Sequence, residues 1–361
     1  MDWIGLGIIV AKIVFFLLVG FTAAGYVMNL AERKISAFMQ DRLGPNRVGF
    51  WGLLQPVADI IKLFFKEDVV TDRASKVIYF VAPMIIAFTA LSALAVIPLT
   101  DVLTFFGRGM AIQIANLNVG ILFIFAIASL GTYGAVLSGW AGNSKYSFLG
   151  GLRSSAQMIS YEVSMGLSII GILMIFESLR LNDIILGQSP LLWGFLPKWG
   201  IVVQPLAFII FLTAAFAETN RVPFDLQEAD AELVAGFHTE FSNSMKFGMF
   251  FMAEYINMFT SSAVIVILFF GGWQIPGIST AEIVSFFISL GASEFFASLF
   301  TILLQLGVTF AKIAFFMFLF VWVRWTIPRF RYDQLMNLGW KGLLPLAILN
   351  ILATGLVMVI I

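Results

Sequence analysis

Long apolar runs alternate with shorter polar segments along the whole chain. Eight of the runs approach or exceed the ~20 residues that an α-helix needs to cross a lipid bilayer. They lie at about 4–31, 77–99, 116–140, 155–177, 201–217, 247–270, 295–323 and 342–361. Alternating segments of about ten residues, the pattern of a membrane β-barrel, are absent. The sequence therefore predicts an all-α polytopic membrane protein, with residues 1–361 forming one membrane domain of about eight transmembrane helices.

The basic residues are shared unequally between the two sets of connections. Sixteen Lys and Arg residues lie in the four segments 32–76, 141–154, 218–246 and 324–341. The alternate connections contribute only Arg108, Arg180 and Lys198. Because cytoplasmic loops carry an excess of Lys and Arg, we expect the four basic segments in the cytoplasm and both termini on the non-cytoplasmic side. The N-terminus begins with an acid at residue 2 and has no basic region, so we expect no cleavable signal peptide.

Residues 52–66 show a different pattern, in which polar and apolar side chains separate to opposite faces of a helix. The polar stripe consists of Gln55, Asp59, Lys62 and Lys66. The apolar face consists of Leu53, Val57, Ile60, Ile61 and Phe64. We expect an amphipathic helix that lies along the membrane surface or against the bundle. It is either an interfacial anchor or one wall of a binding site, and Asp59 is the residue that could decide between them.

Composition limits the chemistry that the chain can perform alone. Hydrophobic residues make up 60% of it, charged residues only 12%, and the net charge is zero, so nothing points to nucleic-acid binding. There is no cysteine, hence no thiolate ligand for zinc or an iron–sulfur cluster. The single histidine, His238, is interpreted as a polar loop residue. We expect no metal centre and no redox centre on this chain.

The segment from Glu218 to Glu240 concentrates charge between two apolar runs. It contains one basic residue, Arg221, and six carboxylates: Glu218, Asp225, Glu228, Asp230, Glu232 and Glu240. So many acids beside membrane-spanning runs cost free energy unless they line water, meet cations or carry protons. We therefore interpret this segment as the functional centre of the chain.

Two local explanations compete with a proton path in this segment. Asp225 and Glu228 have the spacing of a capping box, which predicts a short helix that begins at Pro223–Asp225 and ends near Gly236. Capping does not account for the remaining acids. These form either a solvated acidic loop or a coupled set of carboxylates that exchange protons.

Three of the charged residues inside predicted spans, Glu162, Glu254 and Lys312, lie well away from the ends of those spans. Glu162 lies roughly 13 Å along its helix from Arg153, at 1.5 Å per residue, so it must face the bundle interior. It either accepts a hydrogen bond from a neighbouring polar side chain or handles protons. Glu254 and Lys312 lie at comparable depths, which predicts either an ion pair across helices or two functional charges.

The segment 324–341 mixes aromatic and basic side chains. Trp322, Trp325, Tyr332 and Trp340 bracket Arg324, Arg329, Arg331 and Lys341. Aromatic and basic residues together favour the headgroup level of a membrane. For most of these residues we expect an anchoring role.

Three long stretches carry a resemblance to a known family. They read AERKISAFMQDRLGPNRVGFWGLLQPVADIIKLFFKED at 31–68, AETNRVPFDLQEADAELVAGFHTEF followed by MKFGMFFMAEYINM at 217–258, and VRWTIPRFRYDQLMNLGWK at 323–341. The chain resembles the complex I subunit 1 family, whose bacterial members are the H subunits of NADH–quinone oxidoreductase. The resemblance covers nearly the whole chain.

The resemblance implies a function in quinone reduction. Members of this family form part of a quinone chamber and couple quinone reduction by NADH to proton translocation. The positions that match chamber residues are Glu32, Arg33, Arg42, Asp59, Arg221 and Asp225. A second set of positions is assigned to an acidic route for protons. It consists of the acids that match the family, Glu162, Glu218, Glu228, Asp230, Glu232 and Glu240, together with Glu254. The match of Lys312 to a functional position of the family is weaker. No residue of this chain is expected to be catalytic.

The resemblance also implies where the missing chemistry resides. Quinone is the substrate, while FMN and the iron–sulfur clusters belong to partner subunits of the peripheral arm. The expected surroundings are other complex I subunits and lipid in a bacterial inner membrane, and the isolated chain is expected to be inactive. Three alternatives remain: a related hydrogenase-type or other quinone-linked complex, a free-standing ion transporter, and a structural scaffold.

Overall fold

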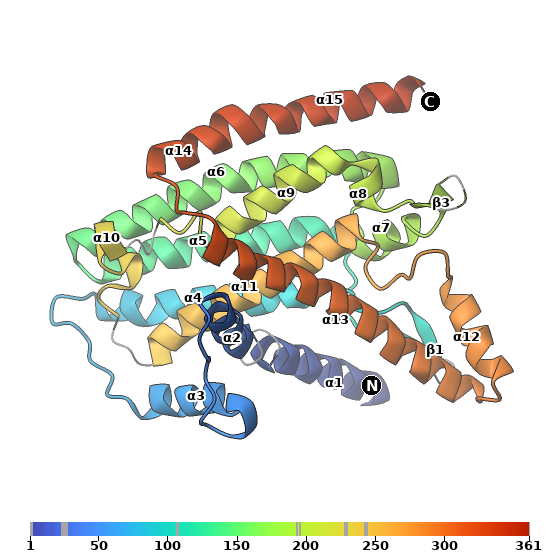
Figure 1. Cartoon of the computed structure of the whole chain (residues 1–361), viewed down its shortest axis with the longest axis horizontal. Coiled ribbons are helices and arrows are strands. Elements are labelled where there is room, and N and C mark those ends of the chain that lie inside the picture. The colour runs from blue at the N-terminus through green and yellow to red at the C-terminus, as the bar shows by residue number, and fades with distance from the viewer. Residues whose placement is uncertain are drawn as a thin grey trace.

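The computed structural model describes residues 3–22, 28–105, 108–192, 194, 196–226, 230–241 and 245–360. Figure 1 shows a bundle of long helices that run roughly along one direction, with short helices at both ends and the two hairpins at one of them. Six helices in the described ranges are long and apolar enough to cross a membrane. They are α4 (Lys76–Leu94), α5 (Gly120–Ala141), α6 (Lys145–Phe176), α11 (Met245–Phe269), α13 (Glu294–Thr326) and the stretch Tyr332–Ile360 that ends in α15 (Leu344–Ile360).

The two remaining predicted spans correspond to shorter apolar helices. These are α1 (Trp3–Val19) and α9 (Pro205–Glu218), the second preceded by the single turn α8 (Gly200–Val203). Pro205 occupies the first turn of α9, where a missing backbone N–H breaks no helical hydrogen bond. The prediction of an all-α polytopic membrane protein is therefore confirmed.

Helices extend further into the polar segments than the hydrophobic pattern indicates. Helix α2 (Asn29–Met39) carries Glu32 and Arg33 in helical backbone. Helix α6 begins at Lys145, so most of the segment 141–154 is helical. Polar side chains beside an apolar run can be helical as well. The apolar pattern alone therefore ends the first helical region too early and begins α6 too late.

The amphipathic helix is α3 (Gln55–Phe65), preceded by the 3₁₀ turn η2 (Phe50–Gly52). Its apolar side chains are largely exposed: Ile61 is 51% and Phe64 is 63% accessible. On its polar side, the Gln55 amide donates to Asp59 Oδ1 at 3.0 Å. The predicted segregation of faces is present, with the apolar face turned away from the bundle.

Several small elements have no counterpart in the hydrophobic pattern. The hairpin β1 (Leu103–Phe105) and β2 (Arg108–Met110) pairs antiparallel, as do β3 (Leu191–Leu192) and β4 (Leu196–Pro197). Short helical segments are α7 (Leu181–Gly187), α10 (Asp230–Leu233), η3 (Gly236–His238), α12 (Thr280–Ser289), α14 (Tyr332–Asn337) and the π-helical turn η4 (Leu338–Leu343). At the start of α12, Ser279 and Glu282 form a capping box.

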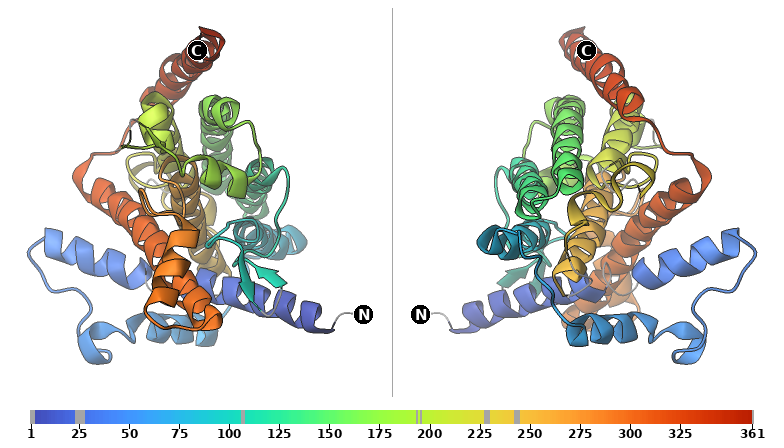
Figure 2. Two further views of the ribbon diagram at one scale, coloured as in Figure 1. Left: turned by 90° about the vertical axis from the view of Figure 1, so that its right-hand side faces the viewer. Right: turned by 90° about the vertical axis from the view of Figure 1, so that its left-hand side faces the viewer.

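The core lies where α6, α9, α11 and α13 meet. Phe211, Phe259 and Phe320 are almost fully buried there, and the rings of Phe216 and Phe320 lie 4.2 Å apart. Helix α15 packs mainly on α6 and stands at the edge of the bundle (Figure 2). Helix α1 begins and α15 ends at the same end of the bundle as α12, whereas α3 and α10 lie at the opposite end (Figure 1). This arrangement agrees with an even number of crossings.

Candidate functional site

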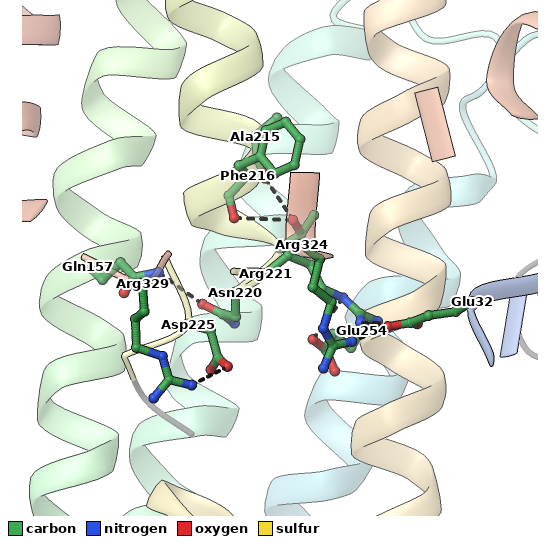
Figure 3. Close-up of polar contacts among 11 residues, drawn as sticks. Glu32, Gln157, Ala215, Phe216, Asn220, Arg221, Asp225, Glu254, Arg324 and Arg329 are labelled. Atoms are coloured by element: carbon green, nitrogen blue, oxygen red, sulfur yellow. Dashed lines mark hydrogen bonds and ion pairs between the residues drawn. The ribbon is translucent and has the colours of Figure 1, made fainter. Parts of the chain in front are cut away.

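Four charged side chains from four segments meet near the α3 end of the bundle (Figure 3). Arg221, just after α9, places Nη1 3.0 Å from Glu32 Oε1 on α2 and Nε 3.2 Å from Glu254 Oε1 on α11. Arg324, near the end of α13, forms an ion pair with the same Glu32 oxygen. We call Arg221, Glu32, Glu254 and Arg324 the charge cluster. It alternates in sign along the chain of contacts Arg324, Glu32, Arg221 and Glu254.

Burial makes the members of the charge cluster depend on one another. The side chains of Arg221 and Glu32 are only 5% and 8% exposed. Burial alone raises the pKa of Glu32, but Arg221 and Arg324 outweigh it and leave that pKa below the ordinary value. Burial acts to lower the pKa of Arg221, and Glu254 and Glu32 reverse that effect and raise it. The Arg221 guanidinium also stacks on the Tyr255 ring, 4.8 Å from its centroid.

The backbone around Arg221 is fixed by α6 and by the end of α9. Gln157 on α6 donates to the carbonyl of Ala217 at 2.7 Å and to Asn220 Oδ1 at 3.4 Å. Asn220 has a φ of 55°, a left-handed conformation that Asn tolerates better than most residues. The Arg221 N–H then returns to the carbonyl of Phe216 at 3.3 Å. The turn thus aims the guanidinium across the bundle toward α2 and α11.

A cavity of about 400 Å³ lies beside the charge cluster, and we call it the outer cavity. Charged side chains on its wall include Asp225, Arg324 and Arg329. The Arg329 guanidinium donates to Asp225 Oδ2 at 2.8 Å. Its other lining residues are largely apolar or aromatic: Val222, Ala235, His238, Phe247, Phe251 and Trp325. An apolar wall with a few fixed charges is the usual composition of a small-molecule site.

A second cavity of about 90 Å³ lies deeper in the bundle, and we call it the inner cavity. Three carboxylates line it, namely Glu162, Glu218 and Glu254. Polar neighbours on its wall are Thr89, Thr132, Thr219, Asn220, His238, Asn257, Thr260 and Ser261. Its volume accommodates several water molecules at ~10–15 Å³ of such space each. Glu218, from the acidic segment, therefore lines the same cavity as Glu162.

Glu162 faces the interior, as its position in the helix requires. The Ser129 hydroxyl on α5 donates to Glu162 Oε1. This hydrogen bond fits the structural alternative, whereas the position of Glu162 on the cavity wall beside Glu218 and Glu254 fits the proton-handling one. Both features are present together, so a hydrogen bond to serine does not exclude proton exchange.

Of the two alternatives for Glu254 and Lys312, the ion pair between them is wrong. Glu254 pairs with Arg221. Lys312 Nζ donates instead to the backbone carbonyls of Phe270, Gly272 and Gln274 at 2.8, 2.9 and 2.8 Å. Lys312 thereby binds the unsatisfied carbonyls that follow the end of α11, at the end of the bundle away from the charge cluster.

The predicted short helix at Pro223–Asp225 is also wrong. Residues 221–226 are not helical, and the described helical residues that follow them are those of α10, Asp230–Leu233. Asp225 is therefore no helix cap, and its carboxylate binds Arg329. Glu228 lies outside the described residues, and so does the side chain of Asp230.

Two other predicted acids lie away from the inner cavity. Glu232 pairs with Arg153 on α6, and its side chain is 49% exposed. Glu240 Oε2 accepts a hydrogen bond from Thr71 at 3.3 Å, and its carbonyl accepts one from Tyr79 at 3.1 Å. Their assignment to a proton path remains a prediction, and the structure gives each of them a local partner.

The remaining residues that the resemblance assigns to a chamber lie on the side of α2 and α3. Arg33 Nη1 contacts Asp59 Oδ2 at 2.6 Å, which joins the two helices at an exposed position. Arg42 is exposed beyond the end of α2. Glu32 alone of this group enters the buried charge cluster.

Sequence reasoning missed three residues of the site. Arg324 and Arg329 were expected to anchor at the headgroups, and His238 was expected to be a polar loop residue. Arg324 and Arg329 bind Glu32 and Asp225, and His238 is only 6% exposed between the two cavities. The local pattern gave no signal for the arginines, because interfacial anchors show the same mixture of aromatic and basic residues.

No three His, Cys, Asp or Glu side chains within the described ranges converge as ligands of a metal ion. The ionisable groups of the site are instead carboxylates, guanidinium groups and one imidazole, which exchange protons and bind polar groups of organic molecules. Fold and site together define a polytopic α-helical membrane protein with a buried charge cluster between two cavities.

Comparison with known proteins identifies the family. The sequence matches the NADH dehydrogenase family over residues 11–355. It is 49% identical over 325 residues to an NADH-quinone oxidoreductase subunit of Cytophaga hutchinsonii, covering 90% of this chain and 89% of that protein. It is 47% identical over 346 residues to NADH-quinone oxidoreductase subunit 8 of Rhodothermus marinus, covering 96% of each chain. This chain belongs to the NADH dehydrogenase family.

Proposed function

We propose that this chain is a membrane subunit of a bacterial NADH–quinone oxidoreductase, where it forms part of the quinone chamber and couples quinone reduction to proton translocation. The names of its relatives support the complex and the reaction. The observation that carries the proposal is the charge cluster, since Arg324 lines the outer cavity and Glu254 lines the inner one. A change of charge in one cavity therefore reaches the other through two buried ions.

The outer cavity is the place proposed for the quinone headgroup. Its aromatic wall suits a flat ring, and Arg324 and Arg329 supply donors to carbonyl oxygens. The exposed apolar face of α3 would guide an apolar tail from the lipid. Asp59 and Arg33 lie at that entrance, and Arg42 lies beyond α2.

Coupling follows from electrostatics. Two electrons delivered to a quinone place negative charge in the outer cavity until two protons complete the quinol. That charge attracts Arg324 and weakens the ion pair between Arg324 and Glu32. Glu32 then pairs more strongly with Arg221. The ion pair between Arg221 and Glu254 becomes weaker as a result. Glu254 then takes up a proton more readily, and Glu162 and Glu218 share the same cavity.

The electron carriers are proposed to lie elsewhere. FMN and iron–sulfur clusters would be held by partner subunits of the peripheral arm, and this chain alone would not oxidise NADH. The end that carries α3 and α10 would face the cytoplasm of a bacterial inner membrane, with both termini on the other side.

The test is Arg324→Gln in the assembled complex, with Arg331→Gln as the control. Arg331 is 74% exposed and pairs with Asp333. We expect Arg324→Gln to raise the KM for quinone and lower turnover by at least about tenfold, because a charge-assisted hydrogen bond is worth ~1.5–3 kcal/mol. Arg331→Gln should leave both values unchanged. Wild-type values in an assembled Arg324→Gln complex would contradict the proposed chamber.

A further inference from the structure

We propose that His238 relays protons between the outer and inner cavities, an inference that rests on the proposed function. Of all the described residues that line the two cavities, His238 alone lines both. It lies on η3, in the segment that connects α10 with α11. The charge cluster also joins the cavities, but guanidinium groups hold their protons and carry only charge.

The position of His238 is fixed by close packing of η3 on α6. A Cβ atom at Gly150 would lie only 2.7 Å from the backbone of Gly236 and Phe237, so the two backbones touch where Gly150 has no side chain. The Ser147 hydroxyl donates to the carbonyl of Phe237 at 3.2 Å. These contacts hold the imidazole at one place between the cavities.

Aromatic rings pack around the imidazole. The ring centroids of Phe237, Phe250 and Phe247 lie 3.8, 4.7 and 5.7 Å from that of His238. Burial lowers the pKa of His238 to about 3, so the ring is neutral near neutral pH. A neutral imidazole has one N–H donor and one acceptor nitrogen. It can therefore carry a proton through an apolar barrier without holding a permanent charge.

The charged and titratable groups on either side set the direction. On the inner side these are Glu162, Glu218 and Glu254, and on the outer side they are Asp225, Arg324 and Arg329. When negative charge forms in the outer cavity, one ring nitrogen releases its proton there while the other takes a proton from the carboxylic acid of Glu162 or Glu218. One proton enters the ring as one leaves it, and Glu254 can then take up the proton that this acid regains. Exchange of tautomers restores the starting state.

The test uses His238→Gln and His238→Asn in the assembled complex. Both amides can donate and accept hydrogen bonds, but neither can pass a proton through its side chain. We expect the rate of proton translocation to fall at least about tenfold, since positioned proton transfer contributes ~10²–10⁴ in rate. Thr239→Ser, at the next residue, should keep the wild-type translocation.

Chemical rescue separates proton transfer from packing. Imidazole added to His238→Ala should restore translocation, and a non-basic ring of the same size should not. Wild-type translocation in the amide variants would overturn the relay. Failure of both amide variants to assemble would also overturn it, because His238 would then be needed for structure.

A parallel variant distinguishes this failure from failure of the proposed function. Glu162→Gln should abolish translocation if the inner cavity takes part in coupling. Loss in Glu162→Gln with wild-type behaviour in the His238 variants would leave the proposed function intact and remove only the relay. Wild-type behaviour in both would contradict coupling through the inner cavity as a whole.

Discussion

At the scale of single residues, Glu32 has the most constrained environment in the site. One carboxylate oxygen contacts two arginines from different segments, and the side chain is nearly buried. A buried ion pair need not add net stability, but removal of one member leaves an uncompensated charge that costs about 3–5 kcal/mol. The neutrality of the charge cluster thus matters more than any one of its contacts.

We therefore expect Glu32→Gln to destabilise the chain by about 3–5 kcal/mol. The effect would be measured by heating the purified complex and recording the temperature at which this subunit is lost. Glu67→Gln, at an exposed carboxylate, is the matched control and should leave the unfolding temperature within error. Equal unfolding temperatures for the two variants would show that Arg221 and Arg324 do not depend on Glu32.

The same substitution should change the response to pH. The pKa of Glu32 is lowered from its ordinary value of 4.5, so its stabilising contribution is present above that value and is lost as pH falls through the lowered pKa. Glu32→Gln should remove this acid-induced loss while lowering stability at neutral pH.

At the scale of elements, the connections between helices are held by single polar side chains that reach backbone groups. Gln157 fixes the end of α9, and Lys312 fixes the end of α11 through three carbonyls. Helix ends in an apolar bundle need such partners because water is scarce there. Loss of Gln157 should disturb the charge cluster, because Gln157 fixes the turn that carries Arg221. Loss of Lys312 should not, because Lys312 lies far from the charge cluster.

Lys312→Met should therefore affect stability and spare the reaction. Met preserves the length of the side chain but leaves three carbonyls without their donor, and we expect a loss of about 2–4 kcal/mol. The control is Lys145→Met, at an exposed lysine. For both variants we would measure the unfolding temperature, and the rate of quinone reduction at a temperature well below it. A large loss of activity in stable Lys312→Met complexes would argue for a functional charge instead.

The sequence predicts the apolar spans and the position of acids far better than it predicts their partners. Glu162 and Glu254 are recognisable because a carboxylate in an apolar run must face the interior. The partner of Glu254 depends on helix rotation and tilt, which depth along the chain does not specify, so Lys312 was a plausible but wrong choice. Asp225 shows the same limit, because local spacing favoured a cap while its true partner Arg329 lies 104 residues further on.

At the scale of the whole molecule, α3 and α10 lie at one end and the two terminal helices begin and end at the other (Figure 1). The chain has no cysteine, so single cysteines can report which end faces which compartment. We expect Ser189→Cys, beside β3, to react with a membrane-impermeant maleimide in intact cells. Asn46→Cys, between α2 and α3, should react only after the membrane is permeabilised. The reverse pattern would invert the proposed orientation.

The charge cluster also has a consequence for synthesis of the chain. Its members enter the membrane in the order Glu32, Arg221, Glu254 and Arg324, and the last comes near the end of α13. Until α13 is inserted, the nascent bundle holds two buried glutamates and one arginine, an excess of negative charge in an apolar setting. Chains that stop before Arg324 should therefore be recognised as unfinished and degraded by membrane proteases, even when every earlier helix has been inserted.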